Sequence, residues 1–139
     1  MRRVVLMTIA AGVLVAGAAP MVRAQDAKAE RGKYLVEEVA RCQECHSPKT
    51  ETGEFDRTKW MKGATLAATP STPIADWHQR SPDITSTSVL WTRWGQDGVV
   101  KFLQTARNPR GGKAGPPMPA YTVSADDAGA IAAYLKSLP

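Results

Sequence analysis

The chain has 139 residues, of which 43% are hydrophobic and 22% charged, with two cysteines and a formal net charge of +5. This length allows one small domain and excludes a second enzyme domain. The composition is too balanced for a disordered or collagen-like chain, and two cysteines cannot form a disulfide-dense scaffold.

The first 24 residues have the order of a secretory signal peptide. Two arginines precede an uncharged stretch, 4–19, and small residues stand at Val22 and Ala24. The uncharged stretch is shorter than the roughly 20 residues that a membrane-spanning helix needs. We therefore expect residues 1–24 to be cleaved. The mature domain, 25–139, is then periplasmic or otherwise exported, with no stable membrane span.

The charge of the mature domain removes the main support for nucleic acid as a partner, and we expect none. Cleavage removes three arginines, which leaves 15 basic residues against 13 acidic ones and a formal charge of +2. The remaining lysines and arginines are scattered among acids and form no cluster.

Both cysteines lie in the stretch Cys42-Gln43-Glu44-Cys45-His46, which is the CxxCH pattern of covalent c-type haem attachment. Thiols three positions apart on one helical turn can each add to a vinyl group of the porphyrin. The histidine that follows can then reach the iron from the proximal face. We expect one haem c per chain, attached through Cys42 and Cys45, with His46 as an iron ligand.

Three other interpretations of the motif are weaker. A thioredoxin-type disulfide would need a strand before it and a βαβ pattern around it, whereas the flanks indicate helix and then loop. A structural zinc site needs four ligands, and the mature chain offers two cysteines, His46 and His78 without a second closely spaced pair. A chance occurrence would have to bring together both cysteines and one of the two histidines.

The segment before the motif predicts a helix over 26–41. It contains no proline, and one face carries Gly32, Leu35, Val39 and Cys42. Glycine inside a helix costs about 1 kcal/mol relative to alanine, so Gly32 indicates that another element packs closely there. The alternative is an indifferent glycine near a frayed helix start.

Two further helices are predicted. Ser124 and Asp127 form a capping-box-like start, and the apolar face behind them consists of Ala128, Ile131, Leu135 and Leu138. Another helix is expected over 94–106, with Gly95 and Gly98 weakening its first turn. The two apolar-faced helices at the ends of the domain have only each other and a cofactor to cover them.

The remaining segments are predicted to be irregular, which makes the domain all-α. Residues 47–89 contain four prolines and little periodicity, with a short helical turn expected near 74–78. In 107–119, seven of the 13 residues are glycine or proline, and Met118 is the only large apolar side chain.

Three residues compete for the position opposite His46 on the iron. Met118 is favoured because the neighbouring prolines stiffen the backbone that would present its sulfur. Met61 has the commoner role of filling a gap in the core. His78 could ligate instead but lies in a polar and aromatic stretch, and an open sixth position would leave the Pro-Pro-Met-Pro segment unexplained.

These features together resemble class I monohaem cytochromes c over about residues 29–138. The matching pieces are the attachment motif, Pro117-Met118-Pro119, the terminal segment 126–138, and Gly32 with Tyr34-Leu35. The resemblance implies the cytochrome c fold, in which three to four helices surround one covalently bound haem and the terminal helices cross. It also implies electron transfer with His46 and Met118 as iron ligands.

A narrower resemblance is to cytochrome domains that partner periplasmic dehydrogenases. These often carry Pro-Asn-Ile-Thr before the third helix, where this chain has Pro82-Asp83-Ile84-Thr85. Asp83 in place of asparagine removes an amide that could donate to a haem propionate. One of the four tryptophans could donate its indole N–H instead, and Arg80 or Arg93 could pair with a propionate.

The sequence therefore predicts an exported electron carrier rather than an enzyme, because moving an electron needs no catalytic acid, base or nucleophile. Its expected partners are redox proteins, namely a dehydrogenase as donor and an oxidase or another cytochrome as acceptor. The first alternative is a haem-bearing subunit of a periplasmic dehydrogenase. The second is a small peroxidase or gas-binding haem protein.

Overall fold

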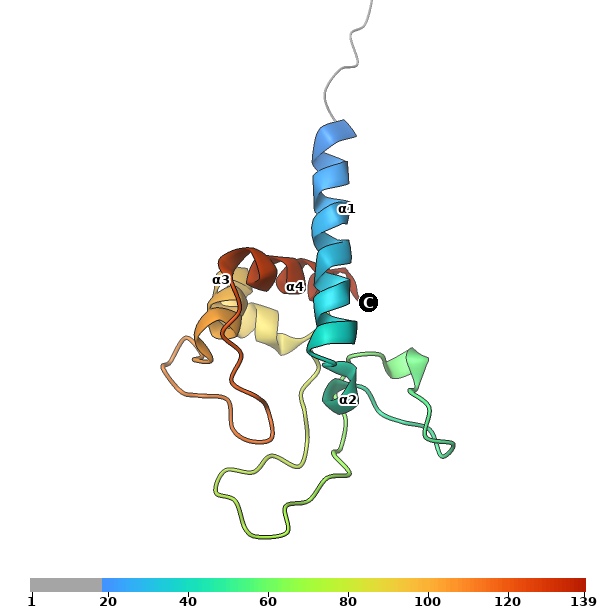
Figure 1. The fold of residues 1–139 in the computed structure, drawn as a ribbon, viewed down its shortest axis with the longest axis vertical. Helices are drawn as coiled ribbons and strands as arrows, with labels where there is room; N and C mark the ends of the chain where they lie inside the picture. Colours follow the sequence, from blue (N-terminus) through green and yellow to red (C-terminus); the bar gives the residue numbers. More distant parts are fainter. Residues whose placement is uncertain (1–18) are drawn as a thin grey trace, which may run out of the picture.

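The computed structural model describes residues 19–139, so most of the predicted signal peptide lies outside it. Four α-helices, a π-helical segment and one 3-10 turn are joined by long loops (Figure 1). Their bounds are α1 Ala19–Tyr34, η1 Leu35–Val39, α2 Gln43–His46, η2 Arg57–Lys59, α3 Val89–Thr105 and α4 Ala125–Ser137. Residues 19–139 contain isolated β-bridges but no strand, which confirms the all-α class.

The terminal helices cross, as the resemblance implies (Figure 1). Gly32 of α1 lies at the crossing, against Ala130 and Tyr134 of α4. A Cβ atom at Gly32 would lie 2.6 Å from the carbonyl carbon of Ala130 and 2.8 Å from the Cβ of Tyr134. The absence of a side chain therefore lets the backbones of α1 and α4 touch. This confirms the predicted close packing and explains why a glycine can stand inside this helix.

The apolar face of the first helix differs from the prediction by one position. Leu35 and Val36 are buried, whereas Val39 is 58% exposed. The last five residues of the helix form η1, in which the Ala40 N–H bonds to the carbonyl oxygen of Leu35, five residues back, at 2.8 Å. A π-helical turn holds more residues than an α-helical one. The face expected from the 3.6-residue period is therefore turned away from the core at Val39, and Val36 is buried instead.

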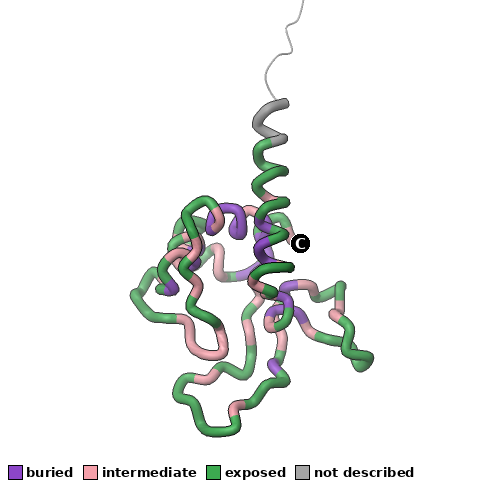
Figure 2. The backbone as a smooth tube through the Cα atoms, viewed as in Figure 1, coloured by how far each residue is buried: buried purple, intermediate pink, exposed green. Residues whose placement is uncertain are grey.

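Helix α4 begins as predicted. The Ser124 hydroxyl accepts a hydrogen bond from the Asp127 N–H at 3.1 Å, and Ala128, Ile131 and Leu135 are buried. Their side chains form the core together with buried residues of η1, α3 and the loops, and Figure 2 shows buried residues where these helices meet.

Helix α3 begins five residues earlier than predicted. The Ser88 hydroxyl accepts from the Leu90 N–H at 3.1 Å and caps the helix, which runs from Val89 to Thr105. At Gly95 the backbone is non-helical, with φ 67° and ψ 175°, so the helix is kinked where the sequence had indicated a weak first turn. The predicted start at Trp94 was therefore the position of this kink.

The loops lie on one side of the crossed helices and are mostly exposed (Figures 1 and 2). Residues 47–88 are irregular as predicted, apart from η2. The short helical turn expected near 74–78 is wrong: the chain makes a tight turn at Ala75 and Asp76, and Asp76 has φ 59°, which cannot continue a right-handed helix. Within the described residues, no helix is long and apolar enough to cross a membrane.

Candidate haem attachment site

The attachment motif occupies one short helical turn that follows the first helix after a sharp bend. Arg41 has φ 50°, in the left-handed region, and so ends η1. The Cys42 N–H then donates to the carbonyl oxygen of Val36 at 2.9 Å, and the His46 N–H donates to that of Cys42 at 2.9 Å. This arrangement places both cysteines and His46 on one turn, as the motif predicts.

Both cysteines are free thiols and partly buried. Burial, with a smaller effect of the neighbouring Cys45, raises the pKa of Cys42 to about 11. The Cys42 thiol is therefore protonated at neutral pH in this fold. The structure has no disulfide between them.

The His46 ring is buried and held in one orientation. Its Nδ1 lies 2.8 Å from the carbonyl oxygen of Pro82, which can only accept, so Nδ1 carries the proton. The lone pair of the neutral ring is then on Nε2, the atom available to a metal. Burial lowers the pKa of His46, although the bond to Pro82 and the charge of Asp83 oppose this effect. Both observations favour a neutral imidazole ligand.

The loop that holds His46 is built by close backbone contacts. The Gly63 N–H donates to the carbonyl oxygen of His46 at 2.8 Å, and Gly63 has φ 85°. A Cβ there would lie 2.6 Å from the carbonyl oxygen of Ser81 and 2.9 Å from the nitrogen of Asp83. The Ser81 hydroxyl in turn donates to the carbonyl oxygen of Cys45 at 2.5 Å. Sequence reasoning missed Gly63 and Ser81, because no periodic pattern marks them.

The segment Pro82 to Thr85 lies directly behind His46. Pro82 supplies the carbonyl that orients the ring, and Ile84 and Thr85 are buried. The carboxylate of Asp83 accepts from the Thr85 N–H at 2.7 Å and from the Thr87 hydroxyl at 3.4 Å. The side chain that replaces the asparagine of the resembling domains thus stabilises its own turn.

The three candidate axial ligands lie in different environments. Met61 is fully buried, and its side chain fills space in the apolar core. Its N–H donates to the Ser47 hydroxyl. Met118 is half-buried on the irregular loop 107–119. His78 is exposed and contacts that loop. Its N–H donates to the carbonyl oxygen of Pro116 at 2.8 Å, and its ring lies over Gly115.

Tyr121 connects the Met118 loop to the attachment motif. Its hydroxyl donates to the carbonyl oxygen of Ala40 at 3.3 Å. Burial, and then the neighbouring thiols of Cys42 and Cys45, raise the pKa of Tyr121. The end of the methionine loop therefore lies beside the two cysteines, although residues 42 and 121 are far apart in the sequence.

One tryptophan has a buried indole N–H without a hydrogen-bond partner, namely Trp77. By contrast, the indole of Trp91 donates to the carbonyl oxygen of Thr85 at 2.6 Å. The Trp60 ring packs edge-to-face against Phe55, and the Trp94 ring packs at a tilt against Phe102. A buried donor without an acceptor is costly, so the Trp77 N–H indicates a missing polar partner. A haem propionate would supply one, and the residues present therefore fit a haem c.

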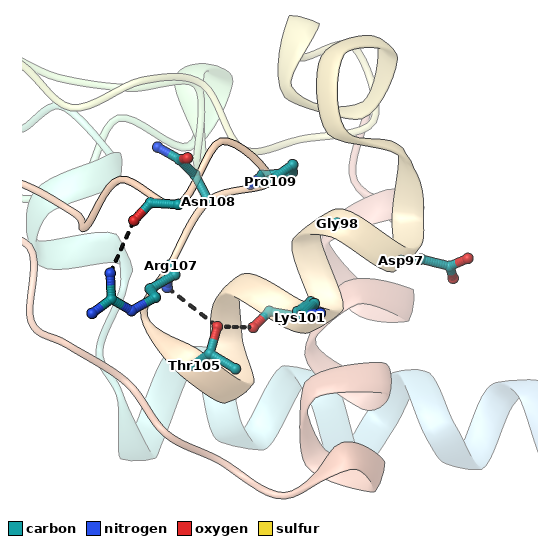
Figure 3. A pocket seen from close by; sticks show the side chains of 8 residues that line it. Asp97, Gly98, Lys101, Thr105, Arg107, Asn108 and Pro109 are labelled. Carbon is teal, nitrogen blue, oxygen red and sulfur yellow. Dashed lines mark hydrogen bonds between the residues drawn. The ribbon is translucent and has the colours of Figure 1, made fainter.

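The hollow between α3 and the loop after it is not this site. It is lined by charged and small residues, among them Asp97, Lys101 and Arg107, and by no cysteine, histidine or methionine (Figure 3). In residues 19–139, no group of three or more His, Cys, Asp or Glu side chains is arranged to hold a metal ion. The zinc alternative thus receives no support from the described part of the chain.

The fold and the site define an all-α domain of the kind that binds haem c. The model of the cytochrome c family matches residues 29–139, so the chain belongs to the cytochrome c family.

The chain is also similar to three longer proteins. It is 30% identical over 115 residues to a diheme cytochrome c-type protein of Cereibacter sphaeroides, covering 79% of this chain and 35% of that protein. It is 34% identical over 121 residues to the cytochrome c subunit of the quinone alcohol dehydrogenase of Gluconobacter oxydans, covering 82% and 24%. Identity to the fructose dehydrogenase cytochrome subunit of Gluconobacter japonicus is 30% over 115 residues, covering 78% and 22%. The chain thus spans about a third or less of the length of these relatives.

Proposed function

We propose that this chain is an exported carrier of single electrons, in which Cys42 and Cys45 hold one haem c and His46 and Met118 ligate its iron. The observation that carries the proposal is the orientation of His46. Its Nδ1 is bonded to the Pro82 carbonyl at 2.8 Å on the turn that bears both cysteines, which leaves Nε2 for the metal. A bound haem c supplies an iron centre that takes up and releases one electron.

The residues of the chain would set the position and the surroundings of the haem. Cys42 and Cys45 would hold the haem covalently on the turn that also bears His46. Met118 would be the second iron ligand. Hydrogen bonds hold the chain on both sides of it: the Pro116 carbonyl oxygen accepts from the His78 N–H, and the Tyr121 hydroxyl donates to the Ala40 carbonyl oxygen. Ligands that stay in place in both oxidation states keep rearrangement small when the electron moves.

The propionates would be bound by the loop that precedes Pro82. The buried Trp77 N–H is a donor without a partner, and Arg80 is exposed three residues further on. A charge-assisted hydrogen bond from the indole would satisfy that donor. This assigns to Trp77 the role that the sequence left open among four tryptophans.

Export completes the proposal. We expect cleavage after Ala24, so that residues 25–139 act in the periplasm among other redox proteins. The partners are a dehydrogenase as donor and an oxidase or another cytochrome as acceptor, and docking between them is weak and transient. The chain itself carries no catalytic residue in this proposal.

The test is the absorption spectrum of the purified ferric protein together with a reductive titration. The proposal expects a low-spin haem c with the weak methionine-to-iron charge-transfer band, and a titration that consumes one electron per chain. A high-spin spectrum would instead indicate a vacant sixth position and would favour a peroxidase or gas-binding protein.

The relatives favour one alternative, a haem-bearing subunit of a dehydrogenase, because two of them are named as dehydrogenase cytochrome subunits. Co-purification from the native host distinguishes the two. Stable association with one dehydrogenase at stoichiometric amounts would show a subunit, whereas recovery as a single small protein that still reduces in the titration would show a free carrier.

A further inference from the structure

Asp83 carries a carboxylate one residue after the carbonyl that orients the proposed iron ligand. It follows Pro82, whose carbonyl oxygen accepts the Nδ1 proton of His46 at 2.8 Å. Its own carboxylate is held by the Thr85 N–H at 2.7 Å and the Thr87 hydroxyl at 3.4 Å, while its carbonyl oxygen accepts from the Ser88 hydroxyl at 2.6 Å. These bonds fix the carboxylate on the residue next to the one whose carbonyl orients the His46 ring.

No ion pair compensates this charge. The salt bridges within the described residues engage Glu44, Asp56 and Asp127, and none engages Asp83. Asp83 is half-buried, and the residues that follow it, Ile84 and Thr85, are buried. Water therefore screens the carboxylate less than it would screen a fully exposed side chain.

We propose that Asp83 lowers the reduction potential of the iron bound at His46. When Fe(III) accepts one electron to become Fe(II), the positive charge of the site falls by one. A fixed negative charge nearby stabilises the more positive ferric state and so opposes reduction. Asp83 is thus a tuning residue that acts through space on the iron, and the inference rests on the proposed ligation by His46.

The experiment compares the midpoint potentials of haem-bearing variants by spectroelectrochemical titration at neutral pH and low ionic strength. Asp83→Asn removes the charge and keeps an oxygen that can accept from the Thr85 N–H. Asp83→Glu keeps the charge and disturbs the turn. Asp97→Asn is the matched control, because Asp97 is exposed on α3 and its side chain points away from the following loop (Figure 3).

We expect Asp83→Asn to favour the reduced state by about threefold to tenfold, where tenfold corresponds to 59 mV for one electron. Asp83→Glu and Asp97→Asn are expected to stay within about twofold of the wild type, on the same electrostatic grounds. If Asp83→Asn does not take up haem, Asp83→Ser carries the same expectation, since its hydroxyl can also accept from the Thr85 N–H.

Each other outcome overturns the inference. An unchanged or lowered potential in Asp83→Asn contradicts it directly. An equal shift in Asp97→Asn would show a general effect of net charge, and an equal shift in Asp83→Glu would show that turn geometry matters instead. A wild-type protein without low-spin haem c would refute the proposed function as well. A normal wild-type spectrum with no shift in Asp83→Asn would refute the tuning role alone.

Discussion

The crossed helices and the loops beside them are stabilised in different ways. The crossing of α1 and α4 is held by contacts within the chain. The backbones touch at Gly32, and Arg31 pairs with Asp127 at 3.1 Å. Close by, the Tyr134 hydroxyl donates to Glu37 of η1. The loops are held by scattered backbone and side-chain hydrogen bonds, such as Gly63 N–H to the His46 carbonyl oxygen, and leave the Trp77 indole without a partner. In the described residues, the two buried side-chain polar atoms without a partner, Gln43 Oε1 and Trp77 Nε1, both lie outside the crossing of α1 and α4.

Gly32→Ala should have the largest effect on the helical region. The added Cβ would collide with the Ala130 carbonyl and with Tyr134, and overpacking of this kind costs about 3 kcal/mol. Urea unfolding of the haem-bearing protein measures the loss.

The matched control for that change is Gly129→Ala on α4. Its Cβ would meet only the mobile end of the Lys28 side chain, at 2.9 Å from Nζ. Alanine is the better helix former by about 1 kcal/mol, so this variant should be as stable as the wild type or more so. Equal stabilities for the two variants would show that the helices do not touch at Gly32.

Gly63→Ala is the corresponding change in the loop region. Gly53 and Gly63 both have φ 85°, but only at Gly63 would a Cβ meet backbone atoms, at Ser81 and Asp83. Gly53→Ala should therefore cost about 1 kcal/mol from backbone strain, and Gly63→Ala about 2 kcal/mol. If thermal or urea unfolding finds the same cost for both, the close contact behind His46 is absent in solution.

A smaller effect is expected in alkali at the contact between α4 and η1. Burial, and then the bond to Glu37, raise the pKa of Tyr134 to about 12. An unfolded tyrosine loses its proton near pH 10, whereas the folded one keeps it, so this contribution is complete below about pH 10 and is lost between about pH 10 and 12. Tyr134→Phe should flatten the fall in unfolding free energy over that range. Tyr34→Phe, at an exposed position, should leave it unchanged.

The sequence predicted the helical region better than the loop region, for a physical reason. Periodicity and capping are local, so they located α4 and the role of Gly32. The π-helical turn before Ala40 and the kink at Gly95 break these local rules. As a result, the predicted apolar face of the first helix was wrong by one position, and the predicted start of α3 was five residues too late. The loop contacts of Gly63 join residues distant in sequence and leave no periodic trace.

The same distinction applies to the site. The spacing of the motif was enough to place both cysteines and His46 on one turn. The partner of the His46 ring, the Pro82 carbonyl, is 36 residues away, so only the fold reveals it. The choice of Trp77 among four tryptophans likewise depends on burial of one nitrogen atom.

The most direct test of the central claim is the ferric absorption spectrum of Met118→Leu beside that of Met61→Leu. Both changes conserve volume and remove one sulfur. Ligation by Met118 predicts that its replacement abolishes the methionine-to-iron band, while replacement of the core residue Met61 leaves the band in place. Persistence of the band in Met118→Leu, or its loss in Met61→Leu alone, would contradict the proposed iron site.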